Sequence, residues 1–166
     1  MSISNKLFCL SCCLLLLSGC THMKNEVLVK EIQEFDLEVK EIDRGVEIIF
    51  PEVLLFGYNS DRLKPEAKAK LHKIADLINA TQFASRAIAV EGHADAIGGK
   101  DFNLGLSKRR AQSVARALVF SGVPKERLAV AWFGKSKPLV PNTHSDGSDN
   151  PQGRRRNRRV EVIIEN

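Results

Sequence analysis

Cysteine is scarce in this sequence of 166 residues and occurs only in its first twenty, at Cys9, Cys12, Cys13 and Cys20. If the segment up to residue 19 is removed, Cys20 is the only cysteine left, and no disulfide can form within the chain. A free thiol would also be out of place in an oxidising compartment. We therefore expect a core without cross-links and no cysteine nucleophile.

A hydrophobic run long enough to span a membrane is missing as well. The largely apolar stretch from Leu7 to Leu17 is shorter than the roughly 20 residues that a spanning helix needs. It follows Lys6 and precedes Ser18 and Gly19, which is the pattern of a secretory signal with small residues before the cleavage site. Residues 1–19 are therefore predicted to be a signal peptide, and the mature chain is predicted to begin at Cys20.

The four residues Leu17–Cys20 resemble a bacterial lipobox, in which small residues precede a cysteine that becomes acylated. The alternative, an ordinary secretory signal that ends near a cysteine, leaves a free thiol. We expect lipidation at Cys20, which would hold the chain on a bilayer because two or more acyl chains bind far more tightly than one. Thr21, in place of Asp, implies by the same resemblance export to the outer membrane, with the domain facing the periplasm.

The formal net charge is +5, and much of the positive charge is clustered in residues 154–159. Clusters of this kind occur in nucleic-acid-binding segments. An exported protein does not meet nucleic acid, however, so no nucleic-acid partner is expected. A solvated basic surface near anionic lipid or cell-wall polymer is the simpler interpretation. The cluster consists of Arg154, Arg155, Arg156, Arg158 and Arg159.

The segment after the signal peptide, residues 20–36, is polar and charged and contains few turn signals. This composition predicts a lipidated N-terminus followed by a short extended linker. Such a linker reaches at most about 55 Å, so the domain would stay close to its membrane. The remaining residues, 37–166, have the length of one domain.

Hydrophobic periodicity predicts the order of secondary structure in the domain. Residues 128–133 are apolar on both faces and are predicted to form a central strand. Residues 134–153, rich in Ser, Pro, Asn, Asp and Gly, are predicted to form an excursion loop. The order favours an α+β fold, a two-layer sandwich in which helices cover one face of the sheet. The predicted elements are strands at 37–42 and 46–50, a helix at 65–79, a strand at 87–91, a helix through 111–121, and strands at 128–133 and 160–164.

Polar residues follow the strand predicted at 87–91, in a position where a loop can bring them to a ligand. Asp95 lies in this loop, and Asn103 and Arg110 follow in the next helix. Asn103 and Arg110 are seven residues apart, so they face nearly the same direction if one helix contains both, whereas Arg109 points elsewhere. An ion pair between Asp95 and Arg110 that only stabilises the loop is the simplest alternative to a binding site.

These residues belong to a longer pattern of spaced polar and small residues. The pattern consists of Gly92, His93, Ala94, Asp95, Asn103, Leu106, Ser107, Arg110, Ala111 and Val114, then Gly134, Pro138, Asn142, Gly153 and Arg154, and finally Asn157, Arg158, Arg159, Val160, Glu161 and Val162. It resembles the motifs of the OmpA-like peptidoglycan-binding family, including the peptidoglycan-associated lipoproteins. The resemblance extends over about residues 38–164 and implies that family's mixed sheet with helices on one face.

The resemblance implies that Asp95 and Arg110 bind the free amino-acid end of diaminopimelate, a crosslinking residue of peptidoglycan stem peptides, with Asn103 bridging both. The chemistry suits this ligand, because an ammonium group needs an acceptor and a carboxylate needs a planar donor. Charge-assisted hydrogen bonds of this kind are about twice as strong as neutral ones. Backbone amides near Ala94 are expected to add donors for the carboxylate.

Asn59 and Arg158 match further pocket positions of the family. Neighbouring residues on a strand face opposite sides, so whether Arg158 or Arg159 faces the ligand stays open. The sequence departs from the family pattern at Gly57–Tyr58, where an acidic and an aromatic residue are commoner. It also departs at Ala94, where many members have Thr, which removes one hydroxyl contact.

The implied function is non-covalent binding of peptidoglycan by an outer-membrane lipoprotein, which would tether the membrane to the cell wall. An alternative is a lipoprotein of the Tol-system type, whose main role is to dock periplasmic protein partners.

No enzyme is expected, because a wall hydrolase would need a second catalytic carboxylate beside Asp95 and His93. A flagellar stator component would retain a spanning helix that carries an acid. Neither a cofactor nor a metal is expected, because His93 is interpreted as bracing its loop and the other histidines are scattered.

Overall fold

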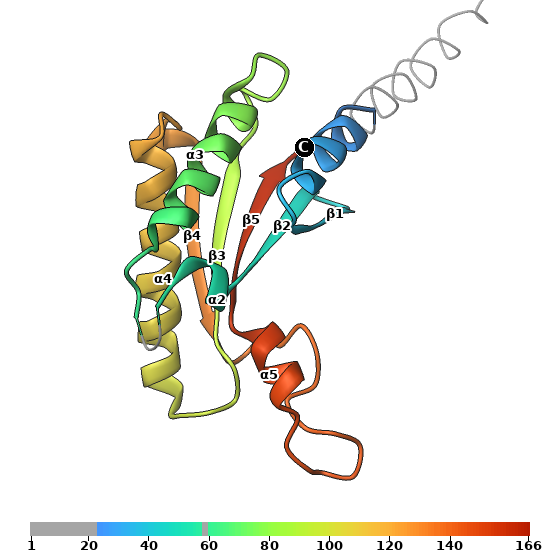
Figure 1. Cartoon of the computed structure of the whole chain (residues 1–166), viewed down its shortest axis with the longest axis vertical. Coiled ribbons are helices and arrows are strands. Elements are labelled where there is room, and N and C mark those ends of the chain that lie inside the picture. Colours follow the sequence, from blue (N-terminus) through green and yellow to red (C-terminus); the bar gives the residue numbers. More distant parts are fainter. Residues whose placement is uncertain (1–22, 58–59) are drawn as a thin grey trace, which may run out of the picture.

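The computed structural model describes residues 23–57 and 60–166 and contains a five-stranded mixed sheet (Figure 1). The strand order is β1-β2-β5-β3-β4, and every neighbouring pair is antiparallel except β3 and β4. The strands are β1 (Glu38–Ile42), β2 (Gly45–Pro51), β3 (Ile88–His93), β4 (Leu128–Gly134) and β5 (Arg159–Glu165). The helices are α2 (Glu52–Leu55), α3 (Pro65–Asn79), α4 (Lys100–Phe120), the 3-10 turn η1 (Lys125–Arg127) and α5 (Pro151–Asn157).

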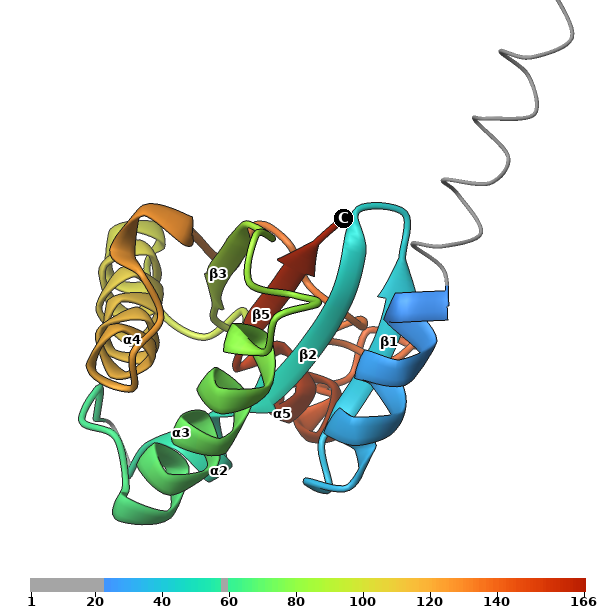
Figure 2. The ribbon, with the colours of Figure 1, turned by 90° about the horizontal axis from the view of Figure 1, so that it is seen from above.

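The α+β class and the two-layer arrangement are confirmed, because α3 and α4 cover one face of the sheet (Figure 2). Alternate residues of the central strands project into the layer between sheet and helices, as the period of two requires. Ile88 and Val90 of β3 are fully buried there with Leu71 of α3 and Val114 of α4. This packing fixes α4 over β3 and so determines where the loop between them lies.

The opposite face of the sheet carries charged side chains that are nevertheless buried. Glu91, His93, Arg159 and Glu161 are between 2% and 6% exposed. Burial acts to raise the pKa of Glu161, but its interactions with His93 and Arg159 outweigh this effect and hold the pKa at about 2. Glu161 is therefore ionised at neutral pH, and charge pairing stabilises this face beside the buried apolar residues Ala89 and Ile163.

Residues 23–33, which the sequence analysis assigns to the extended linker, form a helix that packs beside β1 (Figure 2). Leu28 and Ile32 are fully buried in the core of the domain. Asn25 is 1% exposed; it donates to Glu41 at 2.8 Å and accepts from Arg86 Nη1 at 2.6 Å. The spacing of Leu28 and Ile32, four residues apart, places both on the same side of a helix. The polar composition of the segment hides this narrow apolar stripe.

The strand predicted to be central, β4, is instead the edge strand next to β3. Its Trp132 is 38% exposed, and Ala129 is also exposed. The central position belongs to β5, which pairs with both β2 and β3. The prediction was wrong because small alanines on the outward face of β4 need little cover, whereas Glu161 enters the middle of the sheet by pairing with Arg159.

The excursion loop predicted at 134–153 is shorter, because α5 begins at Pro151. The loop is closed by a bridge between Thr143 and Asp149, and the Asn150 side chain caps α5 by accepting from the Gly153 amide at 2.9 Å. Asn157, fully buried, accepts from the amides of Leu139 and Val140.

Across residues 23–57 and 60–166, no helix combines the length and apolar character needed to cross a membrane.

Truncating Ile32 to alanine is expected to lower the free energy of unfolding by about 3 kcal/mol, because a fully buried side chain leaves a cavity when it is shortened. The matched control is Val27→Ala in the same helix, where the side chain is 48% exposed and the expected change is below about 0.5 kcal/mol. Urea unfolding of the two variants beside wild type measures the difference. Equal midpoints for both variants would show that the helix does not contribute to the stability of the domain.

Candidate functional site

A cavity of about 740 Å³ lies where the loop after β3 meets α2, α4 and α5. Side chains that are far apart in the sequence converge on it from these four segments. The polar and charged residues that line it are Glu52, Lys64, Asp95, Asn103, Arg110, Arg154, Arg155 and Arg158. Five of these eight are basic, so the cavity favours a ligand that carries negative charge.

Gly92 allows the close approach of α4 to β3 that forms this cavity. A Cβ atom at Gly92 would lie 2.1 Å from the backbone oxygen of Ser107, which belongs to α4. The Ser107 hydroxyl, fully buried, donates to Leu104 O at 3.0 Å and accepts from the Gly134 amide at 3.0 Å. Strand and helix are thus joined at the point where the loop carrying Asp95 begins.

Asp95 is 7% exposed, and its two carboxylate oxygens have different partners. Oδ1 accepts from the backbone amide of Ile97 at 2.9 Å, which closes a turn within the loop. Oδ2 accepts from Arg158 Nη1 at 2.7 Å and lies 3.8 Å from Arg154 Nε. The carboxylate is therefore fixed in orientation while it remains on the wall of the cavity.

Arg110 is 2% exposed and is held by three groups. Nη2 forms an ion pair with Glu52 Oε1, Nε donates to the Ser60 carbonyl at 3.3 Å, and the guanidinium lies over the Phe56 ring at 5.3 Å. Burial lowers the pKa of Arg110 and outweighs the opposing attraction of Glu52. The remaining Nη1 atom is buried and has no hydrogen-bond partner among the described residues, so this guanidinium retains an unused donor.

Glu52 links the two sides of the cavity. One of its oxygens pairs with Arg110, and the other accepts from Arg158 Nε at 2.6 Å. Arg158 in turn reaches Asp95, so the charges alternate along one line of contacts from Arg110 to Asp95. Burial acts to lower the pKa of Arg158, but the hydrogen bonds to Asp95 and Glu52 outweigh it and raise the pKa. The four side chains are thus held in fixed orientations relative to one another.

The arrangement excludes a direct ion pair between Asp95 and Arg110 as the main role of these residues, since each has a different partner of opposite charge. What remains is a cavity with a fixed carboxylate at one position and a buried guanidinium at another. Such a pair can bind the two charged groups of an amino acid at once.

Comparison with known proteins identifies the family of this chain. The model of the OmpA family matches residues 55–157, which include the loop after β3, α4 and α5. The chain belongs to the OmpA family. Its match to the family covers Asp95, Asn103 and Arg110 but ends one residue before Arg158.

Among similar members, the outer-membrane lipoprotein YfiB of Pseudomonas aeruginosa is 35% identical over 139 residues, which cover 84% of this chain and 76% of YfiB. A photosystem I P700 apoprotein A2 from Gloeobacter violaceus is 34% identical over 129 residues, but the chain spans only 15% of its length. The solved structure of the cell wall anchor of the T6SS from Pseudomonas aeruginosa has a TM-score of 0.66 and is 25% identical, and the alignment covers 84% of this chain and 94% of the anchor.

Within this OmpA-family domain, Asn103 lies on the same helix as Arg110, as predicted, and both are buried. The hydrogen bonds of its side-chain amide go to backbone carbonyls of the loop after β3 rather than to the Asp95 carboxylate or the Arg110 guanidinium. Asn103 Nδ2 donates to the Ile97 carbonyl at 2.8 Å and so braces the loop that carries Asp95. The Ala94 amide, expected to be a donor for a ligand, is already bonded to the Gly134 carbonyl at 2.8 Å.

The structure separates the two neighbouring arginines that the sequence left unresolved. Arg158 lines the cavity, whereas Arg159 is the first residue of β5 and donates to Glu161 at 2.7 Å on the face away from the helices. Asn59 lies outside the described residues. Glu52 was not found by sequence reasoning; the available signal was an acidic residue directly after a buried strand, which is a common place for a functional group.

Proposed function

We propose that this protein binds peptidoglycan non-covalently and recognises the free amino-acid end of diaminopimelate in the cavity. The observation that carries the proposal is that one cavity is lined by both a fixed carboxylate, Asp95, and a buried guanidinium, Arg110, that keeps an unused donor. Membership of the OmpA family supports wall binding, as does the likeness to a cell wall anchor.

In this proposal the ligand ammonium is accepted by Asp95, and the ligand carboxylate is bound by Arg110 and its basic neighbours. Both carboxylates that line the cavity, Asp95 and Glu52, are paired with arginines, so the site offers no free acid and base pair for hydrolysis. We therefore propose binding without catalysis.

We further propose that Cys20 carries the lipid and that the chain links the outer membrane to the cell wall. The relative YfiB is an outer-membrane lipoprotein, which supports this placement. Modest affinity for each stem peptide suffices, because many tethered copies face one polymer and the effective concentration is high. A role in docking a periplasmic protein, as in the Tol system, is the alternative.

Calorimetric titration of the purified full chain with short stem peptides tests the ligand. A peptide with diaminopimelate is expected to bind at least about tenfold more tightly than one with lysine, which lacks the second carboxylate, because a charge-assisted hydrogen bond is lost. The matched variants are Asp95→Asn, expected to bind weakly, and Asp101→Asn, an exposed position on α4 expected to bind as wild type does.

The titrations test recognition of diaminopimelate and binding of the cell wall separately. Equal binding of the two peptides would refute recognition of diaminopimelate. Binding of neither peptide, together with no sedimentation on insoluble peptidoglycan, would refute wall binding and leave the protein-docking role as the leading interpretation.

A further inference from the structure

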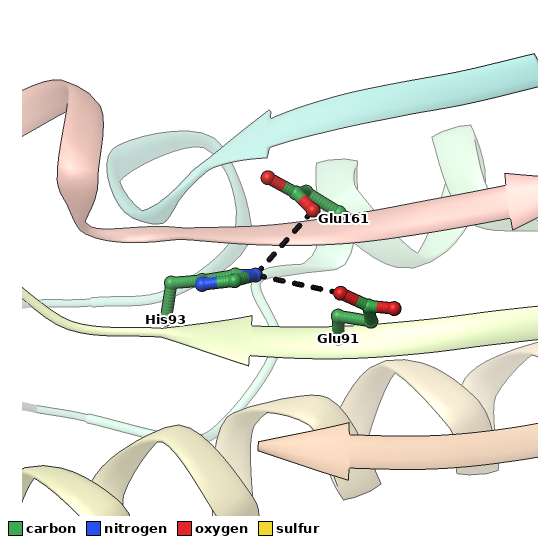
Figure 3. Close-up of side chains that lie close together, drawn as sticks. All are labelled: Glu91, His93 and Glu161. Atoms are coloured by element: carbon green, nitrogen blue, oxygen red, sulfur yellow. Dashed lines mark ion pairs between the residues drawn. The ribbon is translucent and has the colours of Figure 1, made fainter. Parts of the chain in front are cut away.

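Three ionisable side chains meet on the face of the sheet that the helices do not cover, apart from the cavity. Glu91 and His93 are two residues apart on β3, so they project to the same face, and Glu161 lies directly opposite Glu91 on β5. Figure 3 shows the three side chains pointing toward one another. His93 Nε2 lies 3.4 Å from Glu161 Oε2 and 4.0 Å from Glu91 Oε2.

This cluster is buried but incompletely bonded. The side chains of His93, Glu91 and Glu161 are 1%, 8% and 7% exposed. Neither ring nitrogen of His93 has a hydrogen-bond partner among the described residues. A buried polar group without a partner costs about 1–3 kcal/mol, and like charges directly opposite on adjacent strands are destabilising. A cation between the two glutamates would give His93 Nε2 a partner and would reduce the repulsion between their inner oxygens.

Two arginines hold the outer oxygens of the glutamates and leave the inner ones available. Arg44 Nη2 donates to Glu91 Oε1 at 2.7 Å, and Arg159 Nε donates to Glu161 Oε1 at 2.7 Å. The Oε2 atoms are the ones nearest to His93. Carboxylates that bind metals are commonly oriented in this way, by a hydrogen bond to the oxygen that does not ligate.

We propose that Glu91, His93 and Glu161 bind one divalent cation of the zinc class, through His93 Nε2 and one oxygen of each glutamate. Imidazole and carboxylate ligands bind zinc at about 2.0–2.2 Å. In a tetrahedral site, bonds of this length separate two ligand atoms by about 3.4 Å. His93 and Glu161 have this separation already, and all three ligand atoms lie within 4.8 Å of one another.

The donor set narrows the choice of ion. Calcium and magnesium prefer oxygen ligands only, so the imidazole favours zinc or a neighbouring transition metal. Water would supply the fourth ligand, as in zinc sites with three protein ligands. No metal was expected from the sequence, in which the histidines are scattered. The cluster instead combines one histidine with two glutamates that the register of β3 and β5 brings together.

Zinc titration of the purified full chain by calorimetry tests the site. Wild type is expected to bind one zinc ion per chain, and both His93→Gln and Glu161→Gln are expected to weaken binding at least about 100-fold. The matched control is His144→Gln, which removes an exposed histidine from the loop before α5 and is expected to leave the affinity unchanged. Asp95→Asn is expected to bind zinc as wild type does, because Asp95 lies at the cavity.

A second measurement avoids any change to the buried cluster, in case those variants do not fold. In a His22→Gln, His72→Gln and His144→Gln variant, His93 is the only imidazole left, and zinc is expected to shift its ring-proton NMR signals. No zinc binding by wild type, or unchanged binding by a folded His93→Gln variant, overturns the proposal. No shift of the His93 signals in the triple variant overturns it as well.

Discussion

Replacing Arg110 by lysine is expected to weaken binding of a diaminopimelate stem peptide by about 100-fold, equivalent to about 3 kcal/mol. Lysine keeps the positive charge and can still pair with Glu52. It cannot at the same time donate to the Ser60 carbonyl and offer a further donor to a ligand, as the guanidinium does. The substitution therefore tests whether the ligand carboxylate needs the planar guanidinium or only a positive charge at position 110.

The control for this substitution is its neighbour on α4. Arg109 is exposed and pairs with Asp61 at 2.9 Å, outside the cavity, so Arg109→Lys is expected to change the affinity less than twofold. Calorimetric titration of both variants with the same peptide gives the comparison, and thermal unfolding shows whether Arg110→Lys remains folded. A folded Arg110→Lys variant with the affinity of wild type would mean that charge alone binds the ligand carboxylate.

Helix periodicity predicted only that Asn103 and Arg110 face the same direction. The resemblance to the OmpA-like family is what joined Asp95 and Arg158 to them. Glu52 is separated by 58 residues from Arg110 and by 106 from Arg158, and only the assembled sheet brings these partners together. A local sequence pattern cannot predict a contact between residues so far apart in the sequence.

The order of the strands could not be predicted for a related reason. Apolar composition indicates burial of β4 but does not identify its neighbours in the sheet. Charged residues are unusual in a central strand, and it is the ion pair between Arg159 and Glu161 that makes the centre of this sheet tolerable to them. The choice between Arg158 and Arg159 likewise depends on where β5 begins, since that residue determines which side chain leaves the sheet toward the cavity.

Replacing Gly92 by alanine is expected to lower the free energy of unfolding by about 3 kcal/mol, at the upper end of what overpacking usually costs. The added Cβ would lie 2.1 Å from Ser107 O and 3.2 Å from Ala111 Cβ, and the first of these is backbone that cannot rotate away. Helix α4 would have to move from β3. Because α4 carries Arg110 and the loop carries Asp95, affinity for the stem peptide is expected to fall with stability.

The neighbouring Gly99→Ala variant is the matched control, because a Cβ there meets no atom within 4 Å. It adds the same methyl group at the N-cap of α4, where alanine is less favourable than glycine, and the expected change in stability is about 1 kcal/mol or less. Urea unfolding of both variants measures this difference. If Gly92→Ala were as stable as Gly99→Ala and bound the peptide equally well, α4 would be able to move without disturbing the cavity, and the close contact at Gly92 would not be what positions the two charged residues.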